Sequence, residues 1–396
     1  MKKTVTYVFI ILISGGILTY LIMFQHASFL AVIHSNELNK EILNESLKLG
    51  QQFLVNNQKP DGSFNYEYNF VDDSFTPGNS QVRQAGALWG LALSHQDMPT
   101  IEAKAAIEKS ISFFEQNTAK SDVGLYIVYP GESRGRTGTM ALVALGLIDF
   151  LRAEPDHPNK NQYDSLLSGY ISQILSWQMA DKRFFSGYNL TDGKGTSNPS
   201  PYFCGEILLT LCKAAKYQGY SHLKENIVES ASAMYDIYVT AARKEDFDSN
   251  TTKGFYQWSS MSFYEIYAAG WDDQWAEKTI ELAYWMIDTH RTLMRTRNTA
   301  YAHEGMTSAY ELAKLSGDDW AMQKIGTVVD IGLEKLISWQ VGGPLQNEFL
   351  KRNVPTSHIA IGGVMNKQDE PTLRIDVTQH QNHAMILAKR FIYSEE

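Results

Sequence analysis

Residues 303–339 read HEGMTSAYELAKLSGDDWAMQKIGTVVDIGLEKLISW and contain one complete helical hairpin. Between Ile325 and Ile337, apolar side chains recur three and four positions apart, as along the buried face of an amphipathic helix. The polar turn Gly317-Asp318 separates this segment from an earlier helix over 303–315. These residues therefore predict two antiparallel helices joined by a tight turn.

The same pattern recurs along the rest of the chain. One helix over 43–55 comes first, and one over 376–391 comes last. If the last helix pairs with the first, the set closes into six hairpins that start roughly 60 residues apart. We therefore predict an all-α fold in which the hairpins form a ring; an open solenoid of helical pairs is the alternative. The other predicted pairs are 82–94 with 101–116, 137–151 with 163–177, 202–216 with 223–241, and 258–269 with 274–293.

Loop lengths favour the closed ring and predict where its site lies. The first helix of each pair is rich in small residues, which suits a crowded inner ring, and the second is more charged, which suits an outer ring. Every long connection enters an inner helix at its N-terminus, so all of them lie on one rim, where a binding site is expected. The long connections are 58–81, 118–135, 180–201, 243–257, 294–302 and 340–375.

Composition limits the classes of function. The 396 residues are 44% hydrophobic and 20% charged, which excludes collagen-like and disordered chains. With 35 basic against 44 acidic residues, the net charge is -9, which argues against a nucleic-acid partner. Two cysteines exclude a disulfide scaffold, and Cys204 and Cys212 lie too far apart on one predicted helix to bridge.

The N-terminal residues predict a membrane anchor. Two lysines precede an uncharged run over 4–24, which as a helix is long enough to cross a bilayer. The lysines favour a cytoplasmic N-terminus, so we predict a cytoplasmic end and a single-pass inner-membrane anchor over 1–24. A linker over 25–39 and a periplasmic or extracellular domain over 40–396 would follow. A cleaved signal peptide is the alternative, although no convincing cleavage site ends the run.

Three short motifs add a family resemblance. QKPDGSF at 58–64 looks like the Q-x-x-D-G-S-aromatic turn of several α/α toroids, terpenoid cyclases included. FCGE at 203–206 and HEG at 303–305 open predicted inner helices, as similar motifs do in sugar-acting toroids. With its hairpin count, the chain over 40–396 resembles the broad group of six-hairpin glycosidases, N-acylglucosamine 2-epimerase-like enzymes, polysaccharide lyases and terpenoid cyclases. The resemblance implies an (α/α)6 toroid and points to no single family.

Acidic side chains gather at the predicted rim. A glycosidase needs two carboxylates about 5 to 10 Å apart across the bond that it cleaves. The ring offers four candidates, each of which also suits the first turn of a helix for structural reasons: Asp61, Glu206, Glu304 and Asp376.

Histidines at the same rim suggest proton transfer. His380 and His383 share one helix face, and Asp376 lies one turn earlier, where it could orient the ring of His380. Histidines on either side of a sugar could shuttle a proton, as in epimerases. Metal binding with Asp376 or Glu304 is less favoured because no HExxH spacing appears. A packed, hydrogen-bonded histidine cluster with a structural role is the other alternative. We predict no metal and no cofactor, and the predicted catalytic residues are Glu206, His303, Glu304, Asp376 and His380.

Arginines and aromatic side chains suggest what the rim binds. Arginines cluster at the starts of the inner helices, where helix dipoles also favour a uronate, sulfate or phosphate. The alternative is that they pair with loop carboxylates. Tyr202 and Trp258 would stack on sugar rings. The predicted binding residues are Asp61, Arg83, Arg136, Tyr202, Trp258, Arg374 and His383.

These features together predict a membrane-anchored, extracytoplasmic protein that acts on an envelope or extracellular glycan. Hydrolase, lyase or epimerase chemistry would use the acids and histidines of the rim. The expected partners are a glycan or anionic oligosaccharide and the inner membrane. A non-catalytic glycan-binding or scaffold toroid is the alternative, and terpenoid-cyclase-like lipid chemistry is a weaker one.

Overall fold

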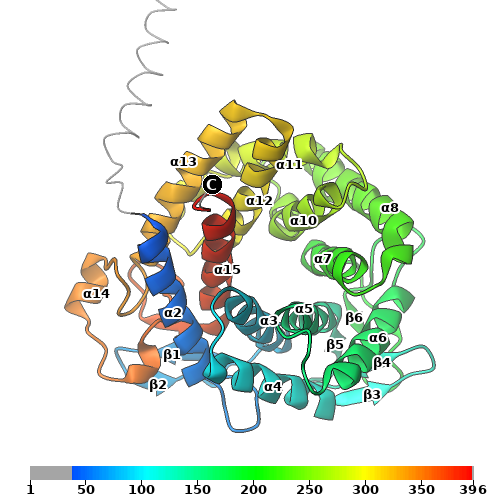
Figure 1. Ribbon diagram of the computed structural model, residues 1–396, viewed down its shortest axis with the longest axis horizontal. Helices are drawn as coiled ribbons and strands as arrows, with labels where there is room; N and C mark the ends of the chain where they lie inside the picture. The colour runs from blue at the N-terminus through cyan, green and yellow to red at the C-terminus, as the bar shows by residue number, and fades with distance from the viewer. Residues whose placement is uncertain (1–37, 395–396) are drawn as a thin grey trace, which may run out of the picture. The chain divides into compact units, whose positions relative to one another are not determined.

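The computed structural model describes residues 38–394, whose helices form a closed double ring (Figure 1). Each inner helix packs against the next inner helix along the chain, and the last one packs against the first. This closure confirms the predicted (α/α)6 toroid and rules out an open solenoid. The inner helices are α3 (Gln81–Asp97), α5 (Thr137–Ala153), α7 (Pro201–Tyr217), α10 (Asn250–Ala268), α12 (Ala300–Ser316) and α15 (Ile375–Phe391).

The outer ring contains the second helix of each hairpin. The helix that comes first in the described chain, α2, packs against α15, as the count of hairpins predicted. Two outer helices continue into π-helical turns, η2 (Asp236–Ala241) followed by α9 (Ala242–Glu245), and η3 (Trp285–Thr289). The outer helices are α2 (Lys40–Asn56), α4 (Ile101–Gln116), α6 (Lys160–Ser176), α8 (Lys224–Tyr235), α11 (Trp275–Tyr284) and α13 (Asp319–Ile337).

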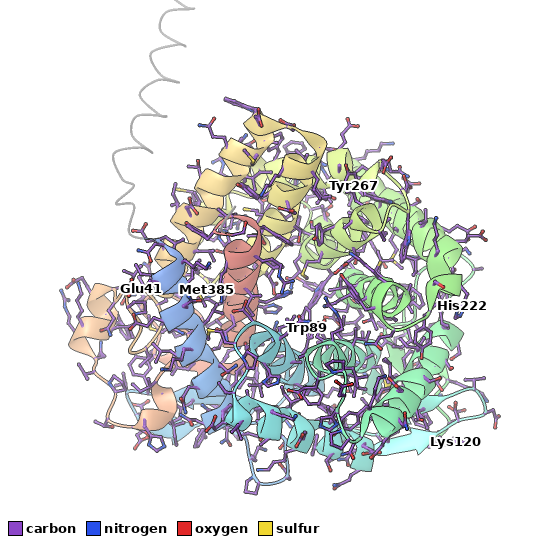
Figure 2. The ribbon with its side chains drawn as sticks, in the orientation of Figure 1. Glu41, Trp89, Lys120, His222, Tyr267 and Met385 are labelled. Carbon is purple, nitrogen blue, oxygen red and sulfur yellow. The ribbon has the colours of Figure 1, made fainter. Side chains whose placement is uncertain are left out.

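Small residues let the inner helices approach one another closely. A Cβ atom on Gly90 of α3 would lie 2.4 Å from Cγ of Gln379 on α15, and one on Gly138 of α5 would lie 2.5 Å from the Phe203 ring on α7. Larger side chains would not fit in this close-packed interior, which explains the composition of the inner helices. Figure 2 shows Trp89 near the centre of the ring and Lys120 at its outer edge.

The long connections carry small antiparallel sheets. Pairing of β1 with β8 joins the connection after α2 to the one before α15, and Glu67 lies opposite Arg374. The sheets have the strand orders β2-β1-β8, β3-β4 and β5-β6-β7. The strands are β1 (Glu67–Asn69), β2 (Ser74–Phe75), β3 (Thr118–Lys120), β4 (Leu125–Ile127), β5 (Gly135–Arg136), β6 (Gly187–Tyr188), β7 (Gly195–Thr196) and β8 (Thr372–Arg374). Short helices complete the connections: η1 (Ser221–Leu223), η4 (Thr292–Met294), α14 (Glu348–Arg352) and η5 (His358–Ala360).

The predicted anchor over 4–24 lies outside the described residues. Within residues 38–394, no helix is long and apolar enough to cross a membrane. Cys204 and Cys212 are both buried and unbridged, as their spacing predicted.

Candidate functional site

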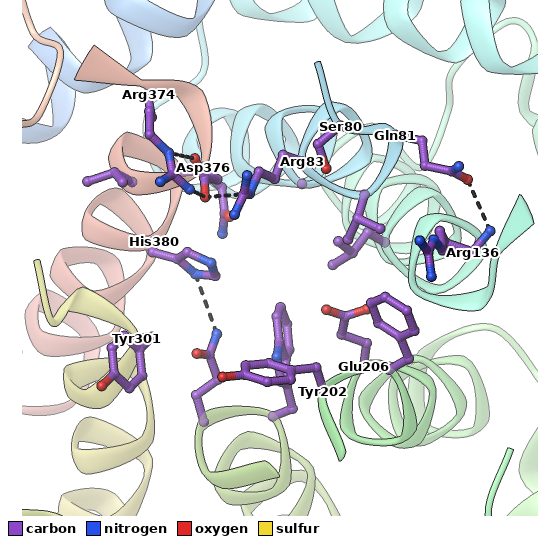
Figure 3. Close-up of a pocket in the computed structure, with 18 of the residues that line it drawn as sticks. Ser80, Gln81, Arg83, Arg136, Tyr202, Glu206, Tyr301, Arg374, Asp376 and His380 are labelled. Atoms are coloured by element: carbon purple, nitrogen blue, oxygen red, sulfur yellow. Dashed lines mark hydrogen bonds and ion pairs between the residues drawn. The ribbon is translucent and has the colours of Figure 1, made fainter. Parts of the chain in front are cut away.

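A cavity of about 670 Å³ opens on the rim where the inner helices begin. All six inner helices contribute lining side chains, and the connections before them add others. This is the rim on which the long connections were predicted to build a site. Figure 3 shows His380 of α15 and Glu206 of α7 projecting into the cavity from opposite sides.

His380 rests on a buried carboxylate. Its Nδ1 lies 3.1 Å from Oε2 of Glu304, and Nδ1 of His383 lies 2.9 Å from Oε1 of the same residue. Gln257 adds a third donor, with Nε2 3.0 Å from Glu304 Oε2. An ionised carboxylate only accepts hydrogen bonds, so each ring donates from Nδ1. The Nε2 atom of His380 is then the ring nitrogen that remains for a ligand.

Charge and burial compete within this cluster. Burial lowers the pKa of His380, but the Glu304 carboxylate outweighs burial and raises that pKa above its ordinary value. For His383 burial prevails, and its pKa is lowered. Burial alone would raise the pKa of Glu304, whereas the two imidazoles hold it below its usual range. The Glu304 carboxylate therefore stabilises the protonated form of His380, which suits a group that takes and gives a proton.

Glu206 is an unusual carboxyl group. The residue is 4% exposed, and its Oε2 atom has no hydrogen-bond partner within the described part of the chain. Burial raises its pKa well above the ordinary value, which favours the neutral, proton-donating form. A buried, unpartnered acid that lines a cavity is a candidate general acid.

Asp376 lies in a clamp of two arginines. Its Oδ2 atom is 3.0 Å from Nε of Arg83, and its Oδ1 atom is 3.0 Å from Nε of Arg374. The sequence suggested that Asp376 orients His380; the structure gives that hydrogen bond to Glu304 and engages Asp376 with the arginines (Figure 3). Asp376 is therefore a carboxyl group at the cavity wall that two arginines already engage.

Four predicted residues do not line the cavity: Glu304 and His383, which are hydrogen-bonded to each other, and His303 and Asp61. His303 is fully buried against the outer ring, where a Cβ atom on Gly332 of α13 would lie 1.9 Å from its Cε1 atom. Asp61 accepts hydrogen bonds from the backbone N and the hydroxyl of Ser63, at 3.0 and 2.7 Å, and so holds its own turn together. Neither side chain lines the cavity.

Two predicted binding residues are buried against Trp89, and of the two Trp258 lines the cavity. Trp258 is 3% exposed, and its ring centroid lies 5.6 Å from that of Trp89. His383 packs edge-on against Trp89, with 4.8 Å between centroids, and does not line the cavity. Tyr202 is 45% exposed at the mouth, which makes it the better placed aromatic platform.

Sequence reasoning missed several polar side chains of the cavity, among them a lysine and two glutamines on α10 and α15. Lys253 and Gln257 of α10 and Gln379 of α15 all line it. Gln379 immediately precedes His380, so its position beside a predicted catalytic residue was the available signal. Lys253 and Gln257 lie in residues that were assigned to a loop.

Comparison with solved structures identifies the fold. A sugar epimerase from a ruminal bacterium aligns with a TM-score of 0.62 at 12% identity, covering 89% of this chain and 98% of that one. A GH76 α-mannanase from Bacteroides thetaiotaomicron gives 0.61 at 10% identity, covering 91% and 98%. Cellobiose 2-epimerase from Bacillus thermoamylovorans gives 0.63 at 10% identity, covering 88% and 98%.

Neither a protein-family model nor a curated protein matches the chain. At these identities the structural likeness establishes architecture alone. The described chain therefore shares the (α/α)6 toroid fold of these solved structures.

Proposed function

We propose that this chain is a carbohydrate-active enzyme that transfers a carbon-bound proton of a sugar, in epimerase, isomerase or lyase fashion. The observation that carries the proposal is the pairing of His380, seated on the buried Glu304 carboxylate, with the unpartnered Glu206 acid across one cavity. The likeness in fold to sugar epimerases and a mannanase supports a sugar as the ligand.

The distribution of carboxylates favours proton transfer over paired-carboxylate hydrolysis. Asp376 is held by Arg83 and Arg374, and Glu304 lies beneath the two histidines. Asp61 lies outside the cavity. Apart from Glu206 and Asp376, the carboxyl group that lines the cavity in the described residues is that of Glu132, which is exposed on the connection before α5. Glu206 therefore has no buried carboxylate partner there that is free to activate a water molecule, as an inverting glycosidase would need.

The residues divide the reaction between two faces of the sugar. Nε2 of His380 removes a proton from carbon, and the positive charge that forms on the ring is stabilised by Glu304. The protonated carboxyl group of Glu206 donates a hydrogen bond, and then a proton, on the opposite face. Tyr202 stacks on the sugar at the mouth of the cavity.

Deuterium exchange tests this proposal. Wild-type protein in D2O is incubated with a panel of neutral and acidic mono- and disaccharides, and incorporation at carbon is followed by NMR. We expect exchange into at least one sugar, and a loss of at least about 100-fold in His380→Asn and Glu206→Gln. His222→Asn, at an exposed histidine on the outside of the ring, is the matched control (Figure 2).

Glu304→Gln separates positioning from folding. Removing the carboxylate should lower the pKa of His380, read from its ring protons by NMR, and slow exchange while leaving the helical circular dichroism intact. Release of reducing ends without deuterium at carbon would instead indicate a hydrolase. Sugar binding without any turnover would indicate a glycan-binding toroid.

We further propose that the substrate is an envelope or extracellular glycan, or an anionic oligosaccharide derived from one. The uncharged run over 4–24 would anchor the chain in the inner membrane and place the toroid in the periplasm or outside the cell. The acidic net charge of -9 supports the expectation that nucleic acid is not a partner.

A further inference from the structure

We infer that Phe247 and the two surface hollows beside it bind an uncharged stretch of a glycan chain on the outside of the ring. This inference rests on the proposed carbohydrate function and goes beyond it, because it gives a long substrate a second site outside the cavity. The site lies where the outer helices α8 and α11 flank the inner helix α10 (Figure 1).

Phe247 presents an aromatic ring to solvent from a backbone that is held in place. The residue is 66% exposed, whereas its carbonyl oxygen accepts a hydrogen bond from Nε1 of the buried Trp285 at 2.7 Å. The next residue, Asp248, is also held, since its Oδ1 atom lies 2.7 Å from Nδ1 of His290. Leaving a phenyl ring in water is unfavourable, and covering it with the apolar C–H face of a sugar would remove that cost.

Two hollows meet at Phe247, which lines both of them. The first has a volume of about 530 Å³ and lies between α11 and the segment formed by η2 and α9. The second has a volume of about 560 Å³ and is lined by the end of η3 and by residues that lead into η4. A single exposed apolar side chain is ordinary on a protein surface, but this one has room for a ligand on either side. Each hollow is lined by a π-helical turn, and such turns are rare and frequent at functional sites.

The charges around Phe247 balance, which favours an uncharged ligand. Nη1 of Arg243 lies 2.7 Å from Oε1 of Glu281 in the first hollow, and Nη2 of Arg295 lies 3.4 Å from Oδ2 of Asp248 in the second. Such pairs set donors beside acceptors, which suits hydroxyl groups because these both donate and accept. A polyanion would meet as many carboxylates as cations. The charged residues that line the hollows, pair with a lining residue or directly precede Phe247 are Arg243, Lys244, Lys278, Arg291, Arg295 and Lys324 against Glu245, Asp246, Asp248, Glu277, Glu281 and Asp288.

The second hollow adjoins the wall of the catalytic cavity. Asp248 lines this hollow two residues before α10 begins, and Lys253 in the first turn of α10 lines the cavity. Burial lowers the pKa of Lys253 and raises that of Tyr301, which also lines the cavity, and the charges of Asp248 and Arg295 act on both groups. A glycan with one end in the cavity would therefore cross the rim directly onto the surface around Phe247.

Uncharged soluble polysaccharides test the site. Full-length protein is titrated by calorimetry with galactomannan, dextran, pullulan, xyloglucan and hydroxyethyl cellulose. We expect at least one of them to bind. Phe247→Ala should weaken that binding about tenfold, since it removes a ring that the polymer would cover.

Matched substitutions assign the binding to this ring. Trp320→Ala removes an aromatic side chain that is 72% exposed at the start of α13, close to the turn after α12, and should leave polysaccharide affinity unchanged. Phe247→Trp keeps an aromatic face and should bind within about threefold of wild type, which a folding defect would not allow. Equal losses in Phe247→Ala and Trp320→Ala would overturn the assignment.

The outcomes separate this site from the proposed function. Deuterium exchange into monosaccharides without binding of any polysaccharide would overturn the site and leave the carbohydrate function standing. Polysaccharide binding that Phe247→Ala weakens, with no exchange into any sugar, would support the site and overturn the proposed catalysis. Binding that survives Phe247→Ala but is lost in Tyr202→Ala would place the polymer at the cavity alone. A wild-type dimer that Phe247→Ala converts to a monomer in sedimentation velocity would make this surface a subunit interface and overturn the inference.

Discussion

His303 is an imidazole enclosed by the protein with neither ring nitrogen hydrogen-bonded within residues 38–394. Burial, together with the charge of Lys335, lowers its pKa from 6.5 to about 3. Between these two values the unfolded chain binds a proton that the folded chain does not. As far as His303 is concerned, the free energy of unfolding therefore has its full value above pH 6.5 and falls as the pH drops toward 3.

His303→Leu should remove this acid sensitivity. The substitution keeps the volume roughly constant and deletes two unsatisfied polar atoms, so the free energy of unfolding at pH 8 should change by less than about 1.5 kcal/mol. Between pH 6.5 and 4, wild-type stability should fall more steeply than that of the variant. Urea unfolding at several pH values measures both, and parallel curves would contradict the assignment.

The rotation of an inner helix about its own axis decides which of its side chains face the ring centre. This explains which site residues the sequence could predict. Residues 303 and 304 are neighbours in the chain, but successive side chains on a helix point about 100° apart. Glu304 therefore faces the ring centre, and His303 faces α13. An inner helix is buried on nearly all sides, so it lacks the apolar stripe from which its orientation could be read. The sequence placed His380 and Glu206 at the rim, whereas the contact of His380 with Glu304 and the lack of a partner for Glu206 Oε2 in the described residues emerge from the structure.

At the scale of elements, one small turn occurs twice in the ring. Gln58 pairs with Phe64 after α2, and Gln178 pairs with Phe184 after α6. In the first copy, Gly62 has a φ of +94° and packs so tightly that a Cβ atom would lie 2.3 Å from the carbonyl oxygen of Lys109 on α4. The motif that suggested the toroid resemblance thus joins neighbouring hairpins, which gives Asp61 a structural role.

Gly62→Ala should destabilise the toroid without altering its chemistry. We expect a loss of about 2–4 kcal/mol, from left-handed backbone strain and from contact with the α4 backbone. Gly131→Ala is the control, because Gly131 has a φ of +80° but nothing within 4 Å of its added Cβ. That variant should lose about 1 kcal/mol. Equal losses in thermal or urea unfolding would show that packing on α4 contributes nothing.

The boundaries of α10 show where element prediction failed and why this mattered for the site. The helix was predicted from residue 258, yet it begins at Asn250. The segment before residue 258 contains threonines and Gly254, which have low helix propensity. Ser249 caps it, accepting a hydrogen bond from Thr251 N at 3.2 Å. Gly254 is required where the Tyr202 ring approaches, since a Cβ atom there would lie 2.7 Å from that ring. The added turns carry Lys253 and Gln257 into the cavity.

At the scale of the whole molecule, closure of the ring followed from counting hairpins. A chain with an unpaired helix at each end has two exposed apolar faces, and pairing them buries both. The strands could not be predicted, because strands of two or three residues are too short to show an alternation of apolar and polar side chains.

The anchor is a prediction about the full chain. Full-length protein should stay with the membrane fraction after alkaline carbonate extraction, whereas a chain that starts at residue 38 should be released. The alternative of a cleaved signal peptide predicts a mature protein that begins after the uncharged run over 4–24. Mass determination of the protein purified from membranes decides between them.

The hairpin of α15 and α2 differs from the others in one respect: no turn connects its two helices. The cavity rim contains the start of α15 and the connection after α2, so Phe391 and Lys40 lie at the opposite rim, where the other hairpins turn. The packing of the ring therefore does not depend on which hairpin carries the two ends of the described chain. A gene rearranged to join residue 394 to residue 38 and to open at Gly219 or Gly317 would encode the same ring. Circular permutation thus offers a way to move the ends of the chain without disturbing the helix starts that line the cavity.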